Sequence, residues 1–157
     1  AAARDRGHLA EAYADRMQFA EAEAALRESI RARRQMLGPV HAEVATALNN
    51  LGEILRVQSA PAEAEPLFRE AREMWLALAG EDHLETAISG YNLATALVDL
   101  KRFAEAAAIF EGSVRTLTAR LGPANPKTEQ AVRAFEEAKR LARTATAEAS
   151  AHSGANP

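Results

Sequence analysis

The chain reads GPVHAEVATALNNLG at residues 38–52 and GEDHLETAISGYNLA at residues 80–94, so the second stretch restates the first after 42 positions. The same shift separates three glycines, Gly38, Gly80 and Gly122. A fixed period of this length is typical of a structure built by stacking copies of one unit. The sequence therefore predicts three full copies of the unit and part of a fourth.

Each copy has the pattern of two helices joined by a turn. In the second copy, an apolar residue recurs at helical spacing, as in Val44, Leu48, Leu51 and Leu55. This spacing places the four side chains on one face of a helix. A second apolar stripe begins after Pro61, which suits the first position of a helix, and ends before Gly80, where a left-handed cap requires glycine. The unit is therefore predicted to be a helical hairpin.

The register fixes the expected boundaries. Helices are expected near residues 3–15, 19–36, 41–57, 61–79, 83–99, 103–121 and 126–146. The repeats are then about 1–40, 41–82 and 83–124, closed by a capping helix at 126–146. Residues 147–157 are poor in large apolar side chains and are expected to be a disordered tail, which leaves residues 1–146 as one all-α solenoid domain.

The composition excludes several classes of function. A net charge of -3 and a pI near 5.9 give no basic excess for a nucleic acid, so we expect no nucleic-acid partner. No cysteine is present, which excludes disulfides and thiolate metal sites. No apolar run approaches 18 residues, so we expect no membrane association and a cytoplasmic location. The chain begins at Ala1 without methionine, which suggests a piece of a longer protein.

The residues of the second copy resemble the tetratricopeptide repeat. The resemblance is carried by Asn50-Leu51-Gly52, Leu55, Ala62-Glu63-Ala64, Phe68 and Ala71, and in the third copy by Asn92-Leu93-Ala94, Leu97, Ala104-Glu105-Ala106 and Phe110. The 42-residue period is similar to that of kinesin-light-chain repeats. The resemblance implies a right-handed superhelical α-solenoid, whose first helices line a concave surface that binds a protein partner.

The same resemblance implies the residues of a peptide-binding surface. The residues predicted for the concave face are Asn49, Asn50, Glu53, Arg56, Tyr91, Asn92, Thr95, Asp99 and Arg133. The amides of Asn50 and Asn92 could pair with the backbone of an extended peptide, or they could instead bond across helices within the array. Arg133 and Arg140 near one end, with Glu11 and Asp15 near the other, would give the surface a mixed charge.

Some positions depart from the family pattern. The turn between the two helices of a hairpin usually holds glycine, but Met17, Ser59 and Lys101 stand there, so these turns are expected to be looser or differently shaped. Gly7, Glu11 and Ile88 occupy positions where related peptide-carboxylate clamps hold cations, which argues against such a clamp.

The sequence favours a binding function over a catalytic one. His41 and His83 occupy equivalent turns with no consistent third ligand, so they are interpreted as turn residues and no metal or cofactor is expected. No Gly-rich phosphate loop is present and no enzymatic activity is expected. The leading hypothesis is a module that binds a peptide or helix along the concave surface. The alternatives are a structural segment that forms a homo-oligomer or docks onto a larger chain, and a regulatory domain of a larger signalling enzyme.

Overall fold

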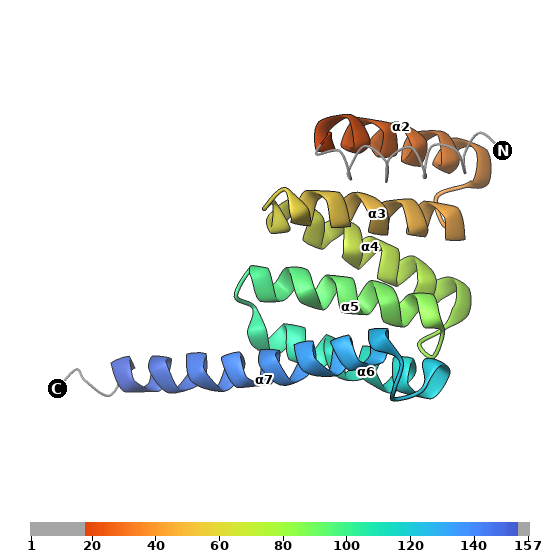
Figure 1. The fold of residues 1–157 in the computed structure, drawn as a ribbon. Coiled ribbons are helices and arrows are strands. Elements are labelled where there is room, and N and C mark those ends of the chain that lie inside the picture. Colours follow the sequence, from red (N-terminus) through yellow and green to blue (C-terminus); the bar gives the residue numbers. More distant parts are fainter. Residues whose placement is uncertain (1–17, 154–157) are drawn as a thin grey trace.

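The computed structural model describes residues 18–153, and all the secondary structure in this part of the chain is helical (Figure 1). The helices are α2 (Phe19–Leu37), α3 (Ala42–Val57), α4 (Pro61–Ala79), α5 (Leu84–Asp99), α6 (Phe103–Leu121) and α7 (Pro126–Ser153). The helix expected at residues 3–15 lies outside the described residues.

The predicted boundaries agree with the structure to within one residue from α2 to α6. The prediction is wrong at the end of the chain, because α7 continues to Ser153 where we expected a disordered tail from residue 147. Alanine has the highest helix propensity of all residues, so an alanine-rich segment continues a helix without needing a buried face. The side chains of Thr146 and Ser150 also bond to carbonyl oxygens one turn earlier.

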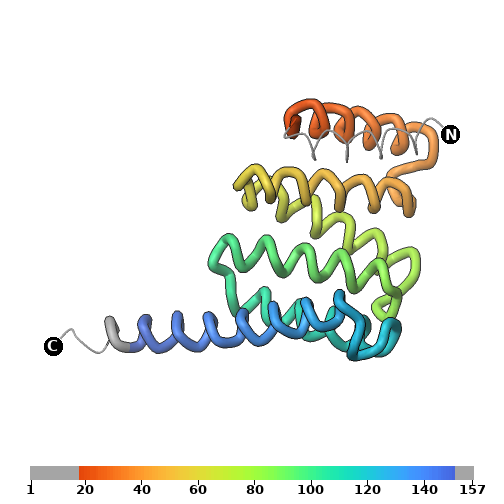
Figure 2. Tube along the Cα trace, in the orientation of Figure 1, coloured from red at the N-terminus to blue at the C-terminus, as the bar shows by residue number. Residues whose placement is uncertain are grey.

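The helices form an open stack of antiparallel hairpins (Figures 1 and 2). Helices α3 and α4 form one hairpin, and α5 and α6 form the next. Helix α4 also packs against α5, and α6 against α7, so each hairpin covers the next. The first helices of successive units, α3, α5 and α7, contact one another and form one side of the stack.

Close packing within a hairpin depends on pairing small residues with large ones. Phe68 of α4 is fully buried against α3, and a side chain at Gly52 would begin only 2.6 Å from its ring. Only glycine leaves room for this approach. Phe110 of α6 is also buried one unit later, although Ala94 and not glycine stands at the position of Gly52 there.

The turns between hairpins require glycine. Gly38, Gly80 and Gly122 have φ values of 90°, 84° and 86° with ψ values of 169°, 176° and 159°. We predicted the left-handed helical conformation here, but these angles lie in a different region that is essentially restricted to glycine. Two of the next three helices begin at histidine caps, since Nδ1 of His41 and of His83 accepts a hydrogen bond from the backbone two residues later.

The turns within hairpins are well defined, where we expected looser or differently shaped ones. Ser59 and Lys101 have φ values of 62° and 60°. The Ser59 and Ala60 amides donate to the carbonyl oxygens of Arg56 and Leu55, which is the hydrogen-bond pattern of a Schellman motif, and Lys101 begins the same pattern one unit later. A non-glycine residue thus adopts the left-handed conformation that the motif requires. Met17 lies outside the described residues.

Candidate functional site

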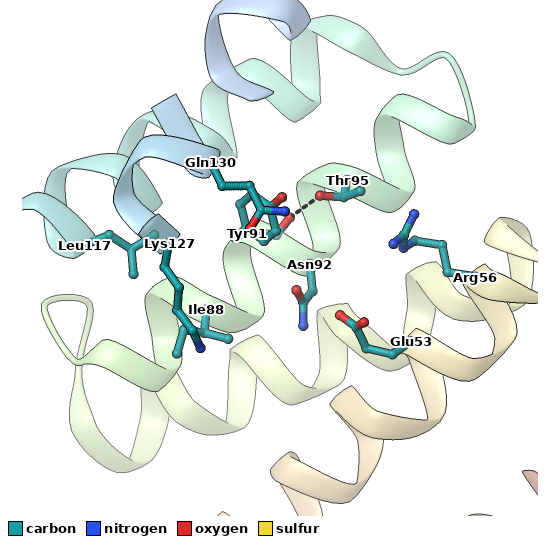
Figure 3. Close-up of a pocket in the computed structure, with 9 residues that line it drawn as sticks. All are labelled: Glu53, Arg56, Ile88, Tyr91, Asn92, Thr95, Leu117, Lys127 and Gln130. Atoms are coloured by element: carbon teal, nitrogen blue, oxygen red, sulfur yellow. Dashed lines mark hydrogen bonds between the residues drawn. The ribbon is translucent and has the colours of Figure 1, made fainter. Parts of the chain in front are cut away.

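A groove of about 290 Å³ crosses the side of the stack formed by α3, α5 and α7 (Figure 3). Its lining residues come from four helices: Glu53 and Arg56 from α3, Ile88, Tyr91, Asn92 and Thr95 from α5, Leu117 from α6, and Lys127 and Gln130 from α7. The repeat explains why these side chains meet, because equivalent positions of successive first helices face the same side of a stacked array.

Helix α5 supplies the floor of the groove. The Tyr91 ring packs against Phe110 with 5.6 Å between the ring centroids, which ties the groove to the core. The Thr95 hydroxyl donates to the Tyr91 carbonyl oxygen at 2.9 Å. Ile88 is half-buried and Leu117 almost fully buried, so the floor includes an apolar area. The floor is therefore held in place by contacts that need no ligand.

The charges of the groove are unevenly distributed. Arg56 forms an ion pair with Asp99 of α5, with 3.5 Å between Nη1 and Oδ2. Glu53 is exposed and forms no ion pair with any residue between 18 and 153. Lys127, on the other side of α5, is also exposed, and its ammonium group forms no ion pair within the described part of the chain. One unpaired negative and one unpaired positive charge therefore flank the floor.

The structure brings together five of the nine predicted surface residues, namely Glu53, Arg56, Tyr91, Asn92 and Thr95. Asp99 lies beside them through its ion pair with Arg56. Asn50 is half-buried and does not line the groove, although it is the repeat equivalent of Asn92.

Two predicted residues lie elsewhere. Asn49 is only 7% exposed, because its side chain is enclosed between α3 and α5, where Nδ2 donates to the Ser89 hydroxyl at 2.7 Å. A bond across helices, which we considered for Asn50 and Asn92, is thus made by Asn49, the residue before Asn50. Arg133 does not line the groove and pairs with Glu129 on its own helix at 3.8 Å.

Four groove residues were missed from the sequence: Ile88, Leu117, Lys127 and Gln130. Gln130 follows Ile88 by the repeat period, so the repeat would have indicated Gln130 only if Ile88 had first been placed in the groove. We expected Arg133 and Arg140 to contribute to a mixed charge on this surface. Arg140 instead pairs with Glu137, and among the described residues the groove takes its unpaired charges from Glu53 and Lys127. Glu11 and Asp15 lie outside the described residues.

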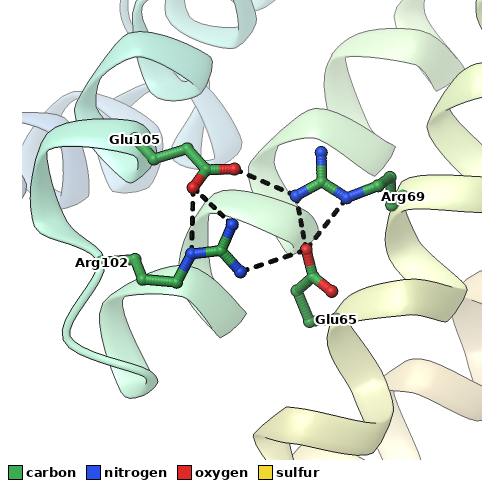
Figure 4. Close-up of polar contacts among 4 residues, drawn as sticks. All are labelled: Glu65, Arg69, Arg102 and Glu105. Carbon is green, nitrogen blue, oxygen red and sulfur yellow. Dashed lines mark hydrogen bonds and ion pairs between the residues drawn. The ribbon is translucent and has the colours of Figure 1, made fainter.

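The second helices carry a network of ion pairs (Figure 4). Arg69 of α4 contacts Glu65 on its own helix and Glu105 of α6, the latter at 3.0 Å. Arg102 reaches the same two carboxylates. Hydrogen bonds to Glu65 and then to Glu105 raise the pKa of Arg69. Burial is the largest single effect on Glu105 and opposes ionisation, but hydrogen bonds from Arg69 and Arg102 together outweigh it and lower the pKa of the carboxyl group.

Two other types of site were considered for the described residues. Between residues 18 and 153, no three histidine, aspartate or glutamate side chains are placed to bind a metal ion. Within the same range, no helix has both the length and the apolar content needed to cross a membrane.

Comparison with known families agrees with this architecture. A model of the tetratricopeptide repeat matches residues 2–75 and 43–119. The chain belongs to the tetratricopeptide repeat family. No curated protein matches the sequence.

Solved structures of other proteins share the fold. A crystal structure of putative kinesin light chain nearly identical TPR-like repeats from Podosopora anserina has a TM-score of 0.81 and 19% identity, and the match covers 88% of this chain and 65% of that one. The crystal structure of BtubC (BKLC) from P. vanneervenii has a TM-score of 0.71 and 20% identity, and covers 99% and 66%. The predicted kinesin-light-chain-like repeat is thus confirmed as a fold, and the chain spans slightly less than two thirds of each of these structures.

Proposed function

We propose that this tetratricopeptide repeat chain is a protein-interaction module that binds a peptide segment of a partner in the groove across α3, α5 and α7. The observation that carries the proposal is the position of Asn92. Its side chain lies in the middle of the groove lining, and it makes no hydrogen bond with any other described residue (Figure 3).

An amide at this position suits a peptide backbone. It offers two donors and an acceptor, which match the C=O and N–H groups that every peptide presents. Tyr91 and Leu117 in the floor of the groove are held by packing, so binding would not require the floor to be ordered first. Repeats of this family generally act as interaction scaffolds, which supports binding rather than catalysis as the function.

The test compares two asparagines at equivalent positions of the repeat. Partner proteins would first be captured from a cell extract with the wild-type chain and identified by mass spectrometry. The affinity of the partner would then be measured by calorimetry for Asn92→Ala and for Asn50→Ala. We expect Asn92→Ala to weaken binding about tenfold, since each lost hydrogen bond contributes about 0.5–1.5 kcal/mol.

The Asn50→Ala variant is the matched control, because it removes the same side chain at the equivalent position outside the groove lining. It should bind the partner within about twofold of wild type. If both variants bind like wild type, the groove is not the binding site, and the proposal is wrong.

A further inference from the structure

The chemistry of the groove lining restricts what can bind in it. Asn92 and Gln130 both line the groove, and their side-chain amides can donate and accept hydrogen bonds. A helix uses its backbone N–H and C=O groups in internal hydrogen bonds, whereas an extended segment leaves them available for these amides. A short extended segment therefore suits this lining better than a helix does.

The apolar part of the floor favours an uncharged side chain near its centre. Half-buried Ile88 presents aliphatic surface, to which Leu117 adds little because it is 2% exposed, and Asn92 and Gln130 contribute amides to the same lining. An extended peptide could therefore pair its backbone with the amides while one apolar side chain covers Ile88.

The flanking charges restrict the occupant further. On the α3 side, the Arg56 charge is compensated by Asp99, so Glu53 leaves a net negative charge. On the α7 side, Lys127 has no compensating carboxylate among the described residues. Figure 3 shows Glu53 and Lys127 on opposite sides of Asn92. A ligand with a single sign of charge would be repelled at one side, whereas a ligand with both signs would be attracted at both.

The geometry points to an extended peptide that places a basic side chain against Glu53, an acidic side chain against Lys127 and an apolar side chain between them. This inference rests on the proposed function, because it names the chemical class of the peptide that the groove takes. It adds that Glu53 and Lys127 select the peptide by charge, while Asn92 binds any backbone.

A random peptide library identifies the preferred ligand even while the natural partner is unidentified. Nine-residue peptides displayed on phage would be selected on the wild-type chain after depletion on Asn92→Phe, in which an aromatic ring fills the centre of the groove. Circular dichroism would verify that this variant keeps its helices. We expect the enriched peptides to carry lysine or arginine on one side of an apolar residue and aspartate or glutamate on the other.

Charge reversal then assigns each contact. An enriched peptide, synthesised with a fluorescent label, should bind Glu53→Lys and Lys127→Glu about two- to twentyfold more weakly than wild type, as expected for reversing one exposed charge pair. Exchanging the basic residue of the peptide for glutamate should restore binding to Glu53→Lys, and exchanging its acidic residue for lysine should restore binding to Lys127→Glu.

Two matched controls reverse the same charges outside the groove. Arg133→Glu lies on α7, like Lys127, and Glu73→Lys lies on the exposed side of α4. Both should bind the peptide within about twofold of wild type.

The outcomes separate the two proposals. Peptides that are enriched without opposite charges, or that bind both groove reversals as tightly as wild type, would overturn the charge selection and leave the proposed function standing. If no peptide is enriched over the depletion on Asn92→Phe, the groove does not bind peptides, and both proposals are overturned.

Discussion

Ser59 and Lys101 hold a backbone conformation that glycine adopts more readily. Both close a Schellman motif with φ near 60°, where a side chain costs on the order of 1 kcal/mol. We predict that Lys101→Gly raises the free energy of unfolding by about 0.5–1 kcal/mol, because the relief of strain exceeds the added entropy of the unfolded chain. Urea denaturation followed by circular dichroism measures this change.

Ala62→Gly provides the matched control, since it introduces the same residue at an exposed site in the first turn of α4. There glycine relieves no strain and should lower the free energy of unfolding by up to about 1 kcal/mol. A loss of stability in Lys101→Gly would show that the turn does not store the strain that we infer from its φ angle.

Asn49 acts in the core and not in the groove. Asn49→Ala removes the donor to the Ser89 hydroxyl, which is fully buried, so the free energy of unfolding should fall by about 1–3 kcal/mol. Peptide affinity should stay unchanged, because Asn49 does not line the groove. Thermal denaturation and calorimetry on one sample measure both quantities, and a loss of affinity in the folded variant would return Asn49 to the binding surface.

At the scale of elements, the ion-pair network joins two second helices. Arg69 of α4 contacts Glu105 of α6, and the pair Arg27–Glu63 repeats this contact one unit earlier, at 3.9 Å. Both pairs are partly exposed to solvent, which limits their contribution. A double-mutant cycle with Arg69→Ala and Glu105→Ala should give a coupling energy below about 1 kcal/mol that decreases with added salt. A larger, salt-independent coupling would contradict the role of a solvent-screened pair.

The lowered pKa of Glu105 gives this network a dependence on pH. The folded chain favours the ionised carboxyl group, so its contribution is present above the ordinary glutamate pKa of about 4.3 and is lost as the pH falls through the lower folded value. We predict that wild type loses more stability than Glu105→Gln between neutral and acidic pH. Equal losses in urea titrations at several pH values would contradict this prediction.

The sequence predicted helices better than it predicted turns and ends. Helix positions follow from apolar spacing, which is a local property, and α4 and α6 begin and end at the predicted residues. The conformation of Gly38 was not predictable in detail, because a glycine pattern shows that φ is positive without specifying ψ. The continuation of α7 was missed because we judged the segment by its capacity to pack against other helices. The high helix propensity of its alanines is enough to continue the helix to Ser153.

The candidate site was predictable only in part, for a different reason. Tyr91, Asn92 and Thr95 of α5 were found because the register of this helix is complete on both sides, whereas Ile88 of the same helix was missed. The contributions of Leu117, Lys127 and Gln130 depend on how α6 and α7 close over the last unit, which is a tertiary property. Asn49 and Asn50 are adjacent in sequence, and the helical spacing alone did not show that Asn49 faces inward.

At the scale of the whole molecule, α7 is the last of the described helices and places charged side chains on the face that it turns away from α6. Its Val132, Glu136 and Lys139 follow by the repeat period three buried residues of α5, Gly90, Ala94 and Leu97. On α7, the Lys139 ammonium pairs with Glu136 at 2.7 Å and lies over the Phe135 ring. A polar outer face on a terminal unit keeps a repeat array soluble.

We therefore predict that Glu136→Leu combined with Lys139→Leu promotes self-association, because it exposes an apolar face that resembles a helix-packing surface. Light scattering over a concentration series should show a molar mass that rises with concentration more steeply than that of wild type. The control exchanges Glu137 and Arg140 for leucine, which removes an exposed ion pair of the same helix at other positions. Equal association of the two double variants would show that apolarity alone, and not its position, drives assembly.

The backbone at Gly38, Gly80 and Gly122 has a consequence for how this gene tolerates change. Because L-amino acids with a side chain almost never adopt these angles, nearly every missense change at the three codons should reduce the amount of folded protein. A saturation-mutagenesis screen for cellular abundance would then display three intolerant sites at equal intervals, while Ser59 and Lys101 accept many replacements. The 42-residue period of the repeat would then be visible in the measured abundance of its variants.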